Sequence, residues 1–467
     1  MKPRLLSWIA QATGGRLVGD DRTVDAVATD TRALPQGGAA LFVALKGENF
    51  DGHEHVAAAA NGGCVAMLVS HAVDVAVPQV VVADTERALG ALAAAVQRER
   101  ASKVLAITGS NGKTSVKTLL LAILEQAGGA YANPGNRNNE IGLPLAVLDA
   151  PEDARFAVYE MGAGKPGDIA YLTAIARPDV ALVNNIAPAH LERMGSLLGV
   201  ADTKAAIYDA LPPEGVAVVN ADDAFAPYFI ERAQGRRVAR IGLDASADIS
   251  ARDIRADGEG SRFVLVTPRG EVEIALSMPG RHNVRNALAA AAMALGAGAT
   301  LEQVRAGLDA VQPVAGRLVA HRLRNGAVLV DDSYNANPGS LDAAIDTLAA
   351  ACSPTSGNEG WLVLGDMREL GADEVALHAQ AGLRAKAAGI ARLYTLGALS
   401  QAAAEAFGEG ARRFESHADL ADALAAQLRE GVRVLVKGSR GSAMDRIVKA
   451  LLASDAAGVD KGEANAA

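Results

Sequence analysis

Residues 103–115, KVLAITGSNGKTS, decide the fold of this chain. The apolar run that ends at Ile107 is typical of a buried strand, and a helical pattern follows from Lys113 to about Gln126. A glycine-containing turn between a strand and a helix lets backbone N–H groups face a single anion, and the helix N-terminus adds positive potential. The sequence therefore predicts a phosphate-binding loop, in which Lys113 reaches the terminal phosphates and the Thr114 hydroxyl is able to ligate magnesium.

The loop departs from the standard phosphate-loop spacing. Two residues rather than four separate Gly109 from Gly112, and Ile107 stands where the standard loop has its first glycine. The strand before it and the helix after it still favour nucleotide binding. The loop residues expected to contact the nucleotide are Thr108, Gly109, Ser110, Asn111, Gly112, Lys113 and Thr114.

Apolar runs of four to six residues alternate with helical segments on both sides of this loop. Such alternation is typical of parallel sheets covered by helices on both faces, so we expect an α/β protein. An alternating polar and apolar pattern between about 240 and 278 indicates an antiparallel appendage. The expected parts are a small α/β domain (1–83), a central P-loop-type parallel-sheet ATPase domain (84–313), a Rossmann-like domain (314–453) and a disordered tail (454–467).

Composition narrows the class of protein. The 467 residues are 50% hydrophobic and 21% charged, which is typical of a globular chain rather than a disordered one. The net charge of -9 argues against general affinity for nucleic acid or for an anionic membrane surface. No apolar stretch is long enough to span a membrane. Two distant cysteines, Cys64 and Cys352, fit a reducing cytoplasm. We therefore expect a cytoplasmic protein, without membrane insertion, that is a monomer.

Two side chains that follow neighbouring strands are candidate metal ligands. Glu160 ends the apolar run 156–160, and His190 comes after the next run, 180–183. The carboxyl ends of parallel strands meet in the crevice where ligands bind, so both should face the loop around Lys113. Magnesium prefers oxygen ligands, which makes Glu160 and Thr114 natural candidates and a histidine ligand less expected.

A competing motif, GAGKPG at 162–167, fits the dinucleotide-binding pattern. That pattern needs an acidic residue at the far end of the next strand to hold a ribose, whereas Asp179 stands at its beginning. We interpret this segment as an ordinary loop, which argues against a nicotinamide enzyme.

Five further motifs join the loop in a recognisable order. They are GNRNNEIGLP at 135–144, YEMGA at 159–163, NNIAPAHLE at 184–192, ADTKAAIY at 201–208 and PGRHNVRNALAA at 279–290. Together with TGSNGKTS at 108–115 they resemble the Mur ligase superfamily, whose ATP-dependent enzymes build the peptide stem of the bacterial cell-wall precursor. The short loop spacing is that family's own form.

The resemblance implies a substrate and a reaction. The segments DDSYNANPGS and LGDMRELG, at 331–340 and 364–371, are similar to those of family members that join D-alanyl-D-alanine to a UDP-N-acetylmuramoyl-tripeptide. In such ligases the substrate carboxylate attacks the γ-phosphate of ATP, and the amine then attacks the acyl phosphate. Two alternatives stay open. One is a family member that adds the third amino acid, and the other is a regulatory P-loop switch that hydrolyses GTP, although no NKxD tetrapeptide is present.

The resemblance also implies roles for single residues. It implies two magnesium ions and a carbamylated Lys204, because a carbamate would turn a repelling ammonium into an anionic oxygen ligand. The implied catalytic residues are Lys113, Lys204 and His190, and the implied metal ligands are Thr114, Glu160, His190 and Lys204. Further implied ATP contacts are Asn283, Asn286, Arg317 and Asp332. The implied substrate contacts are Thr31, Arg32, Lys46, Asn138, Asn139, Asn335 and Lys437. Closure of the last domain is expected about a linker near 313–316.

Overall fold

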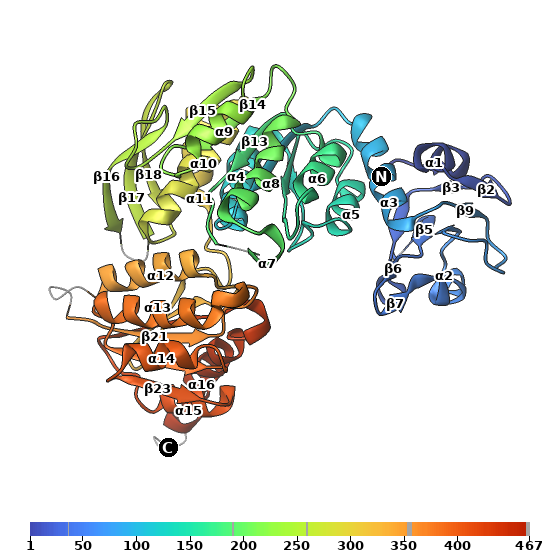
Figure 1. Cartoon of the computed structure of the whole chain (residues 1–467). Helices are drawn as coiled ribbons and strands as arrows, with labels where there is room; N and C mark the ends of the chain where they lie inside the picture. Colours follow the sequence, from blue (N-terminus) through green and yellow to red (C-terminus); the bar gives the residue numbers. More distant parts are fainter. Residues whose placement is uncertain (36, 189–190, 258–259, 353–356, 464–467) are drawn as a thin grey trace.

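The computed structural model describes residues 1–35, 37–188, 191–257, 260–352 and 357–463. Three parallel or mainly parallel sheets follow one another along the chain, and helices pack on each of them (Figure 1). The three-domain α/β architecture expected from the sequence is confirmed. In Figure 1 the central domain lies between the two outer domains.

The N-terminal domain is built on a five-stranded sheet. Its elements are β1 (Arg4–Leu5), α1 (Leu6–Thr13), β2 (Arg16–Val18), β3 (Thr23–Val24), β4 (Ala26–Ala28), η1 (Thr31–Ala33), β5 (Ala40–Val43), β6 (Lys46–Gly47), β7 (Phe50–Asp51), η2 (Gly52–His55), α2 (Val56–Asn61), β8 (Ala66–Val69) and β9 (Gln79–Val81). The strand order is β2-β9-β8-β5-β4, with β2 antiparallel to β9 at one edge. Every residue of β5 and β8 is buried, as the apolar runs there predicted.

The central domain holds a six-stranded parallel sheet and an antiparallel appendage. Its elements are α3 (Thr85–Arg98), β10 (Lys103–Thr108), α4 (Lys113–Gly128), β11 (Ala130–Ala132), α5 (Gly142–Asp149), β12 (Phe156–Glu160), α6 (Asp168–Ala176), β13 (Val180–Val183), α7 (Leu191–Met194), α8 (Leu197–Asp209), β14 (Val216–Asn220), α9 (Ala226–Arg232), β15 (Arg237–Ile241), β16 (Ser250–Asp257), β17 (Gly260–Thr267), β18 (Gly270–Leu276), α10 (Arg281–Ala297) and α11 (Leu301–Ala310). The parallel order is β11-β12-β10-β13-β14-β15, and β16-β17-β18 form the antiparallel sheet expected between 240 and 278.

Helices cover both faces of the central sheet because its strands are apolar on both sides. Alternate side chains of β10 enter two different clusters: Leu105 and Ile107 pack with α4 and α10, while Val104 and Ala106 pack with the helices on the other face. The middle of α10 is a run of alanines, 289–292, each at most 1% exposed. Their small side chains let α10 approach the sheet and α4 closely.

The C-terminal domain is a second doubly wound sheet. Its elements are β19 (Val319–Arg322), β20 (Val328–Asp332), α12 (Pro338–Ala351), β21 (Glu359–Gly365), η3 (Gly371–Asp373), α13 (Glu374–Ala387), β22 (Arg392–Leu396), α14 (Gln401–Phe407), β23 (Ala411–Phe414), α15 (His417–Ala425), β24 (Val432–Lys437), η4 (Arg440–Ser442) and α16 (Asp445–Glu463). The strand order is β19-β20-β24-β21-β22-β23, with only β19 antiparallel to its neighbour. Helices α12, α13 and α14 pack on one face, and α15 and α16 on the other.

The last helix extends further than the sequence predicted. Helix α16 continues to Glu463, ten residues past the point where the sequence predicted the last domain to end. Its apolar residues Ile447, Val448 and Leu451 are anchored in the core, so the helix is nucleated there and continues through the more polar segment.

Across the described residues, no helix is both long enough and apolar enough to cross a membrane.

Candidate active site

The phosphate loop, residues 109–112, leaves the central sheet where its strand order changes direction. Strand β10 lies between β12 and β13, with Ile107 opposite Glu160 and Thr108 opposite Val183. Because the carboxyl ends of parallel strands meet at one edge of a sheet, Glu160 and the segment after β13 stand on either side of the loop.

Two asparagines that follow β13 hold the loop in shape. The backbone N–H of Ser110 donates to the Asn185 carbonyl at 2.9 Å, and that of Asn111 donates to the Asn185 side-chain oxygen at 2.8 Å. The Asn184 amide donates in turn to the Asn111 carbonyl at 2.9 Å. The loop is therefore preorganised by the neighbouring strand.

Gly112 stands at a position where any other residue would be strained. Its φ of 78° lies in the left-handed region, and a Cβ there would stand 2.5 Å from Asn184 Nδ2 and 2.6 Å from Asn286 Oδ1. Helix α4 begins at the next residue, so its free N–H groups and its dipole face the loop. These features suit an anion, and phosphate binding by this loop stays a prediction.

Lys113 folds back over its own loop. Its ammonium donates to the Gly109 carbonyl at 2.7 Å and to the Ser110 carbonyl at 3.4 Å. Burial lowers the pKa of Lys113, and the charge of Arg317 adds to this, whereas Glu160 opposes it.

Glu160 is a buried carboxylate, only 4% exposed, whose two oxygens are both engaged. Oε2 accepts from the Thr114 hydroxyl at 3.0 Å and lies 3.2 Å from the Lys117 ammonium, while Oε1 accepts from the Asn138 amide at 3.0 Å. Burial favours the neutral acid, but the charges of Lys117 and Lys113 outweigh it and hold the pKa of Glu160 below its ordinary value. The group is therefore an anion at neutral pH.

The donor atoms around Glu160 suit one magnesium ion. A carboxylate and a hydroxyl are the hard oxygen ligands that magnesium prefers, and Glu160 and Thr114 supply both beside the anion site. Among the described residues, no group of three His, Cys, Asp or Glu side chains could hold a metal. His190, the other predicted protein ligand, lies outside the described residues.

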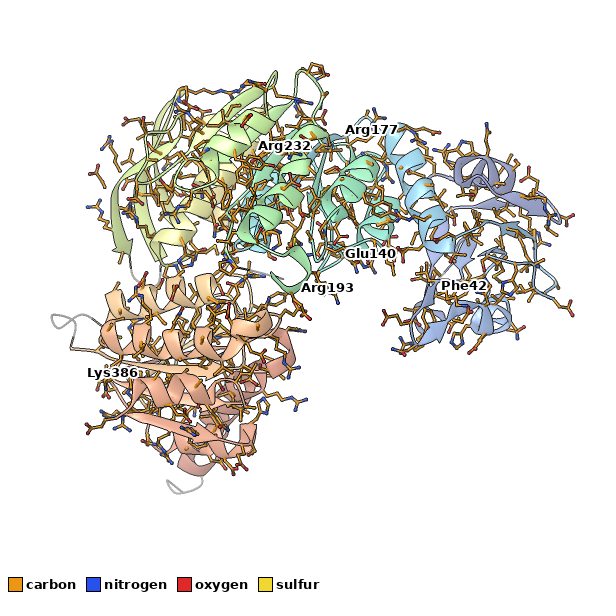
Figure 2. The ribbon with its side chains drawn as sticks, in the orientation of Figure 1. Phe42, Glu140, Arg177, Arg193, Arg232 and Lys386 are labelled. Atoms are coloured by element: carbon orange, nitrogen blue, oxygen red, sulfur yellow. The ribbon has the colours of Figure 1, made fainter. Side chains whose placement is uncertain are left out.

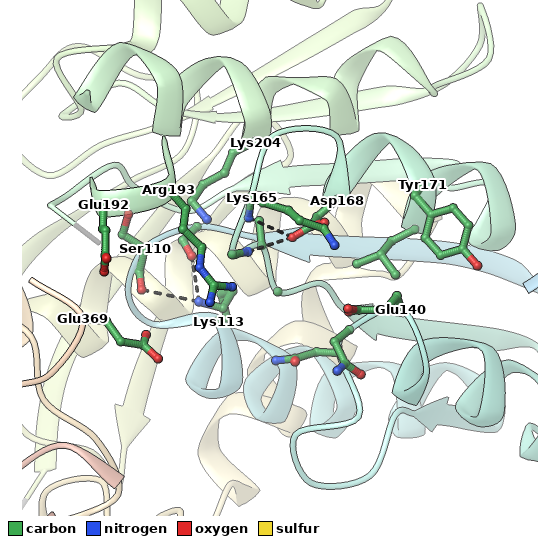
Figure 3. Close-up of a pocket in the computed structure, with 17 residues that line it drawn as sticks. Ser110, Lys113, Glu140, Lys165, Asp168, Tyr171, Glu192, Arg193, Lys204 and Glu369 are labelled. Carbon is green, nitrogen blue, oxygen red and sulfur yellow. Dashed lines mark hydrogen bonds between the residues drawn. The ribbon is translucent and has the colours of Figure 1, made fainter. Parts of the chain in front are cut away.

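Two cavities meet at the phosphate loop. The larger, about 810 Å³, lies between the central and C-terminal domains, and Arg317, Asp332, Asn335 and Lys437 line it together with the loop. The smaller, about 440 Å³, opens on the other side of Lys113 and is lined by Asn138, Asn139 and Lys204 among others (Figure 3). Ser110, Lys113, Asn138 and Glu369 line both.

The C-terminal domain touches the phosphate loop directly. Arg317 donates to the Thr114 hydroxyl at 3.0 Å, and its guanidinium lies 4.5 Å from the centre of the Tyr334 ring. Asn337, which caps α12, donates to the Asn111 side-chain oxygen at 2.7 Å. This domain therefore contributes polar groups to the site.

Asp332 and Lys437, predicted to contact ATP and substrate, are paired with each other. Lys437 Nζ lies 2.5 Å from Asp332 Oδ2 and also donates to the Asn335 carbonyl at 3.0 Å. Burial raises the pKa of Asp332, although the Lys437 charge opposes the shift. Both side chains line the larger cavity.

Asn283 and Asn286 lie on one face of α10, as their spacing predicted, and both line the larger cavity. Their amides are linked at 3.2 Å, Asn283 also donates to the Pro279 carbonyl at 2.8 Å, and Asn286 accepts from Asn184 at 3.1 Å. His282 lines the same cavity, and burial lowers its pKa to about 4. At neutral pH this wall is polar but carries no charge from His282.

Lys204 projects from α8 into the smaller cavity (Figure 3). It is 2% exposed, and burial, followed by the charge of Lys113, lowers its pKa to about 7. Within the described part of the chain, no carboxylate forms an ion pair with it. A buried lysine with so low a pKa loses its proton readily, and Asp168 is the nearby carboxylate that opposes the shift.

Four predicted residues do not join the two cavities. The Thr108 hydroxyl is buried and donates to the Met161 carbonyl at 3.0 Å. Thr31, Arg32 and Lys46 lie in the N-terminal domain, and their charged members pair locally, Arg32 with Asp30 at 2.7 Å and Lys46 with Asp51 at 3.4 Å. Figure 2 shows the N-terminal domain, marked by Phe42, apart from the cavity residues Glu140 and Arg193.

Several residues of the site were not predicted from the sequence. Lys117 stands four positions after Lys113, so helical spacing could have placed it beside the loop. Asn184 and Asn185 belong to a motif noted for its histidine. Asn337 and Glu369 stand in the motifs at 331–340 and 364–371, but their places beside the phosphate loop depend on how two domains meet.

Comparison with known proteins gives consistent matches. The family profile of the Mur ligase middle domain matches residues 107–294, and that of the Mur ligase glutamate ligase domain matches residues 316–440. Among curated relatives, the Escherichia coli UDP-N-acetylmuramoyl-tripeptide--D-alanyl-D-alanine ligase is 44% identical over 451 residues, which cover 96% of this chain and 98% of the relative.

Two solved structures are similar over almost the whole chain. MurF from Acinetobacter baumannii gives a TM-score of 0.89 at 33% identity, covering 97% of this chain and 99% of the other. MurF from Thermotoga maritima in complex with ADP gives 0.82 at 26% identity, covering 92% and 97%.

Proposed function

The chain belongs to the Mur ligase family, and from that premise we propose that it joins D-alanyl-D-alanine to the peptide carboxylate of a UDP-N-acetylmuramoyl-tripeptide. It is an ATP-dependent, amide-bond-forming ligase of peptidoglycan precursor synthesis. The observation that carries this function is the 44% identity to a ligase of that name along nearly the full length of both chains.

The two cavities that meet at Lys113 suit this chemistry. We propose that the larger holds ATP and that the smaller holds the end of the muramoyl-peptide. The peptide carboxylate attacks the γ-phosphate and ADP leaves. The resulting acyl phosphate is attacked by the dipeptide amine, and inorganic phosphate leaves. Carboxylate and triphosphate repel each other, so preplaced positive charge at Lys113 and at the start of α4 lowers the barrier.

Roles for the remaining nucleotide contacts follow from the larger cavity. Loop residues 109–112 cradle the phosphates, and Arg317 is placed to shift from Thr114 to a phosphate oxygen. Asn283 and Asn286 offer amide groups to a base edge, and Asp332 lies on the wall that the C-terminal domain supplies. Water is excluded as this domain closes, which protects the acyl phosphate.

Contacts with the other substrates are proposed from the smaller cavity and the N-terminal domain. Asn138 and Asn139 are placed to contact the muramoyl-peptide, and Asn335 and Lys437 line the side of the larger cavity that the last domain forms. Thr31, Arg32 and Lys46 are proposed to bind the uridine moiety. A cytoplasmic location and a monomeric state remain predictions.

Magnesium and a carbamylated lysine complete the proposal. Glu160 and Thr114 would hold a magnesium ion, which would supply charge neutralisation at the phosphates. A second ion would need His190 and an anion at position 204. The lowered pKa of Lys204, about 7, leaves part of its amine unprotonated at neutral pH, which is the form that reacts with carbon dioxide. Lys113 would then face an anion rather than a second cation.

The decisive experiment measures phosphate release from ATP with UDP-muramoyl-tripeptide, with and without D-alanyl-D-alanine. Release that requires all three substrates, together with an amide product found by mass spectrometry, supports the proposal. Incorporation of a single amino acid into a UDP-muramoyl-dipeptide instead would favour the ligase that adds the third residue. GTP hydrolysis without either peptide would favour a nucleotide switch.

A further inference from the structure

The residues that line both cavities differ in charge and in the domain they come from. Four residues line both cavities: Ser110, Lys113, Asn138 and Glu369. The first three belong to the central domain and none of them is acidic. Glu369 alone carries a carboxylate and alone comes from the C-terminal domain. Of the residues that line both cavities, the one from the C-terminal domain is therefore acidic.

The reaction needs an anion at this point. The incoming dipeptide arrives as an ammonium, and Lys113, Lys165 and Arg193 of the smaller cavity repel it, so its approach depends on one of the acids that line the same cavity. Their charges suit the carboxylate and the acyl phosphate, which are negative. An ammonium can approach the same carbon only beside a carboxylate that offsets these charges.

The other acids of the smaller cavity are less well placed. Asp168 accepts from the backbone N–H groups of Gly164 and Lys165 at 2.9 and 3.0 Å, so it shapes its own loop. Glu140 lies toward the far end of the cavity, near Tyr171 (Figure 3). Glu192 lines only the smaller cavity.

Backbone contacts hold the Glu369 loop in one conformation. The N–H of Met367 donates to buried His378 at 2.9 Å, and the N–H of Arg368 donates to the Ser439 hydroxyl at 2.9 Å. Glu369 itself has a φ of 63°, a conformation that costs about 1 kcal/mol for a residue other than glycine. In Figure 3 its side chain points from this loop toward the part of the cavity where Ser110 and Lys113 lie.

We propose that the Glu369 carboxylate binds the ammonium of the incoming D-alanyl-D-alanine and acts as the base of amide formation. The ammonium passes one proton to this carboxylate, and the freed lone pair forms the C–N bond. The C–O bond between the acyl carbon and the phosphate then breaks, and the second proton leaves the nitrogen with the departing phosphate. This role rests on the proposed function, because it concerns the second half of the same reaction.

The test separates the two halves of the reaction in Glu369→Gln. Hydroxylamine is largely uncharged at neutral pH and traps an acyl phosphate without needing a base. We expect the variant to lose at least about 100-fold in dipeptide ligation, the usual contribution of general base catalysis, but to form hydroxamate from ATP and UDP-muramoyl-tripeptide at the wild-type rate. Its residual ligation should rise with pH up to about 8, where the dipeptide amine loses its proton unaided.

Asp373→Asn is the matched control, since this exposed carboxylate on η3 of the same loop lines neither cavity. Equal ligation by Glu369→Gln and Asp373→Asn would overturn the proposal. An equal loss of hydroxamate formation and of ligation in Glu369→Gln would also overturn it. A selective loss of ligation in Glu192→Gln rather than in Glu369→Gln would have the same consequence. Failure of the wild-type protein to use D-alanyl-D-alanine at all would instead refute the proposed function.

Discussion

Replacing Lys117 with methionine tests whether this lysine is the internal counter-ion of Glu160. The two side chains are 8% and 5% exposed, and their charged atoms lie 3.2 Å apart. Lys117 also donates to the carbonyls of Asn133 and Gly135 at 3.0 and 3.1 Å. The Lys117→Met variant would leave Glu160 as a buried carboxylate that is hydrogen-bonded to Thr114 and Asn138, with Lys113 as its remaining positive charge.

The expected cost is large because the pair is buried. Removing one partner of a buried ion pair costs about 3–5 kcal/mol, since the other charge stays uncompensated. An exposed pair contributes about 0.2–1 kcal/mol. Lys449 and Asp445 on α16 provide the comparison: they lie closer together, at 2.6 Å, but are 75% and 38% exposed. Lys449→Met should therefore cost far less than Lys117→Met, although it breaks the shorter ion pair.

Hydrogen exchange of backbone amides in α4 and β12 is the suitable assay. The only tryptophans, Trp8 and Trp361, lie in the outer domains, so their fluorescence would not report on the central sheet. A loss of about 3 kcal/mol raises exchange through opening of this region by more than about 100-fold. For Lys449→Met we expect less than about a tenfold change in α16.

The pH dependence gives a second measurement. A carboxyl whose pKa is lowered by folding stabilises the protein above its unfolded pKa, and this contribution disappears as the pH falls through the folded pKa. Glu160 is of this kind in the wild type. In Lys117→Met, burial would raise the pKa of Glu160 and neutralise it as the pH falls. The gap between variant and wild type should be wider at about pH 7.5 than at about pH 5.5. Equal effects of the two methionine variants, or a gap that widens toward acid, would refute the reasoning.

Three further tests concern the loop, the domain contact and the buried lysine. Gly112→Ala should weaken ADP binding in calorimetry by at least about tenfold, because of clash and a left-handed φ. Gly129→Ala, also at positive φ but with open space around its Cβ, is the control; equal affinities would contradict this. Asn111→Ala and Asn337→Ala should each raise the KM for ATP by about fivefold without adding in the double variant, since both remove one hydrogen bond. Additive changes in the KM for ATP would show that the two side chains do not act through one shared hydrogen bond. Lys204→Ala should abolish ligation, and short carboxylic acids should partly restore it; full activity without additive would refute the carbamate role.

The fold could be predicted from the sequence because its signals are local. Each strand of the central sheet is an apolar run, and the turn at Gly109 and Gly112 joins a strand to a helix. The place of Glu160 beside the loop also followed, because the end of one parallel strand lies next to the end of another. The pairing of Lys437 with Asp332 did not follow, although both stand at strand ends. Parallel strands β20 and β24 are neighbours in the sheet but far apart in sequence, and their register sets Asp332 opposite Lys437.

The anion site and the side chains of Asn337 and Glu369, which the sequence did not place beside it, come from different domains. The central domain can preorganise its anion site alone, since Asn185, Gly112 and Lys113 come from adjacent strands and the helix between them. In the proposed mechanism the C-terminal domain adds Glu369, a carboxylate that lines both cavities, to this preformed site. Because Glu369 and Asn337 lie on a different domain from the phosphate loop, their places in the site depend on how the two domains meet, and no local pattern of the sequence encodes that contact.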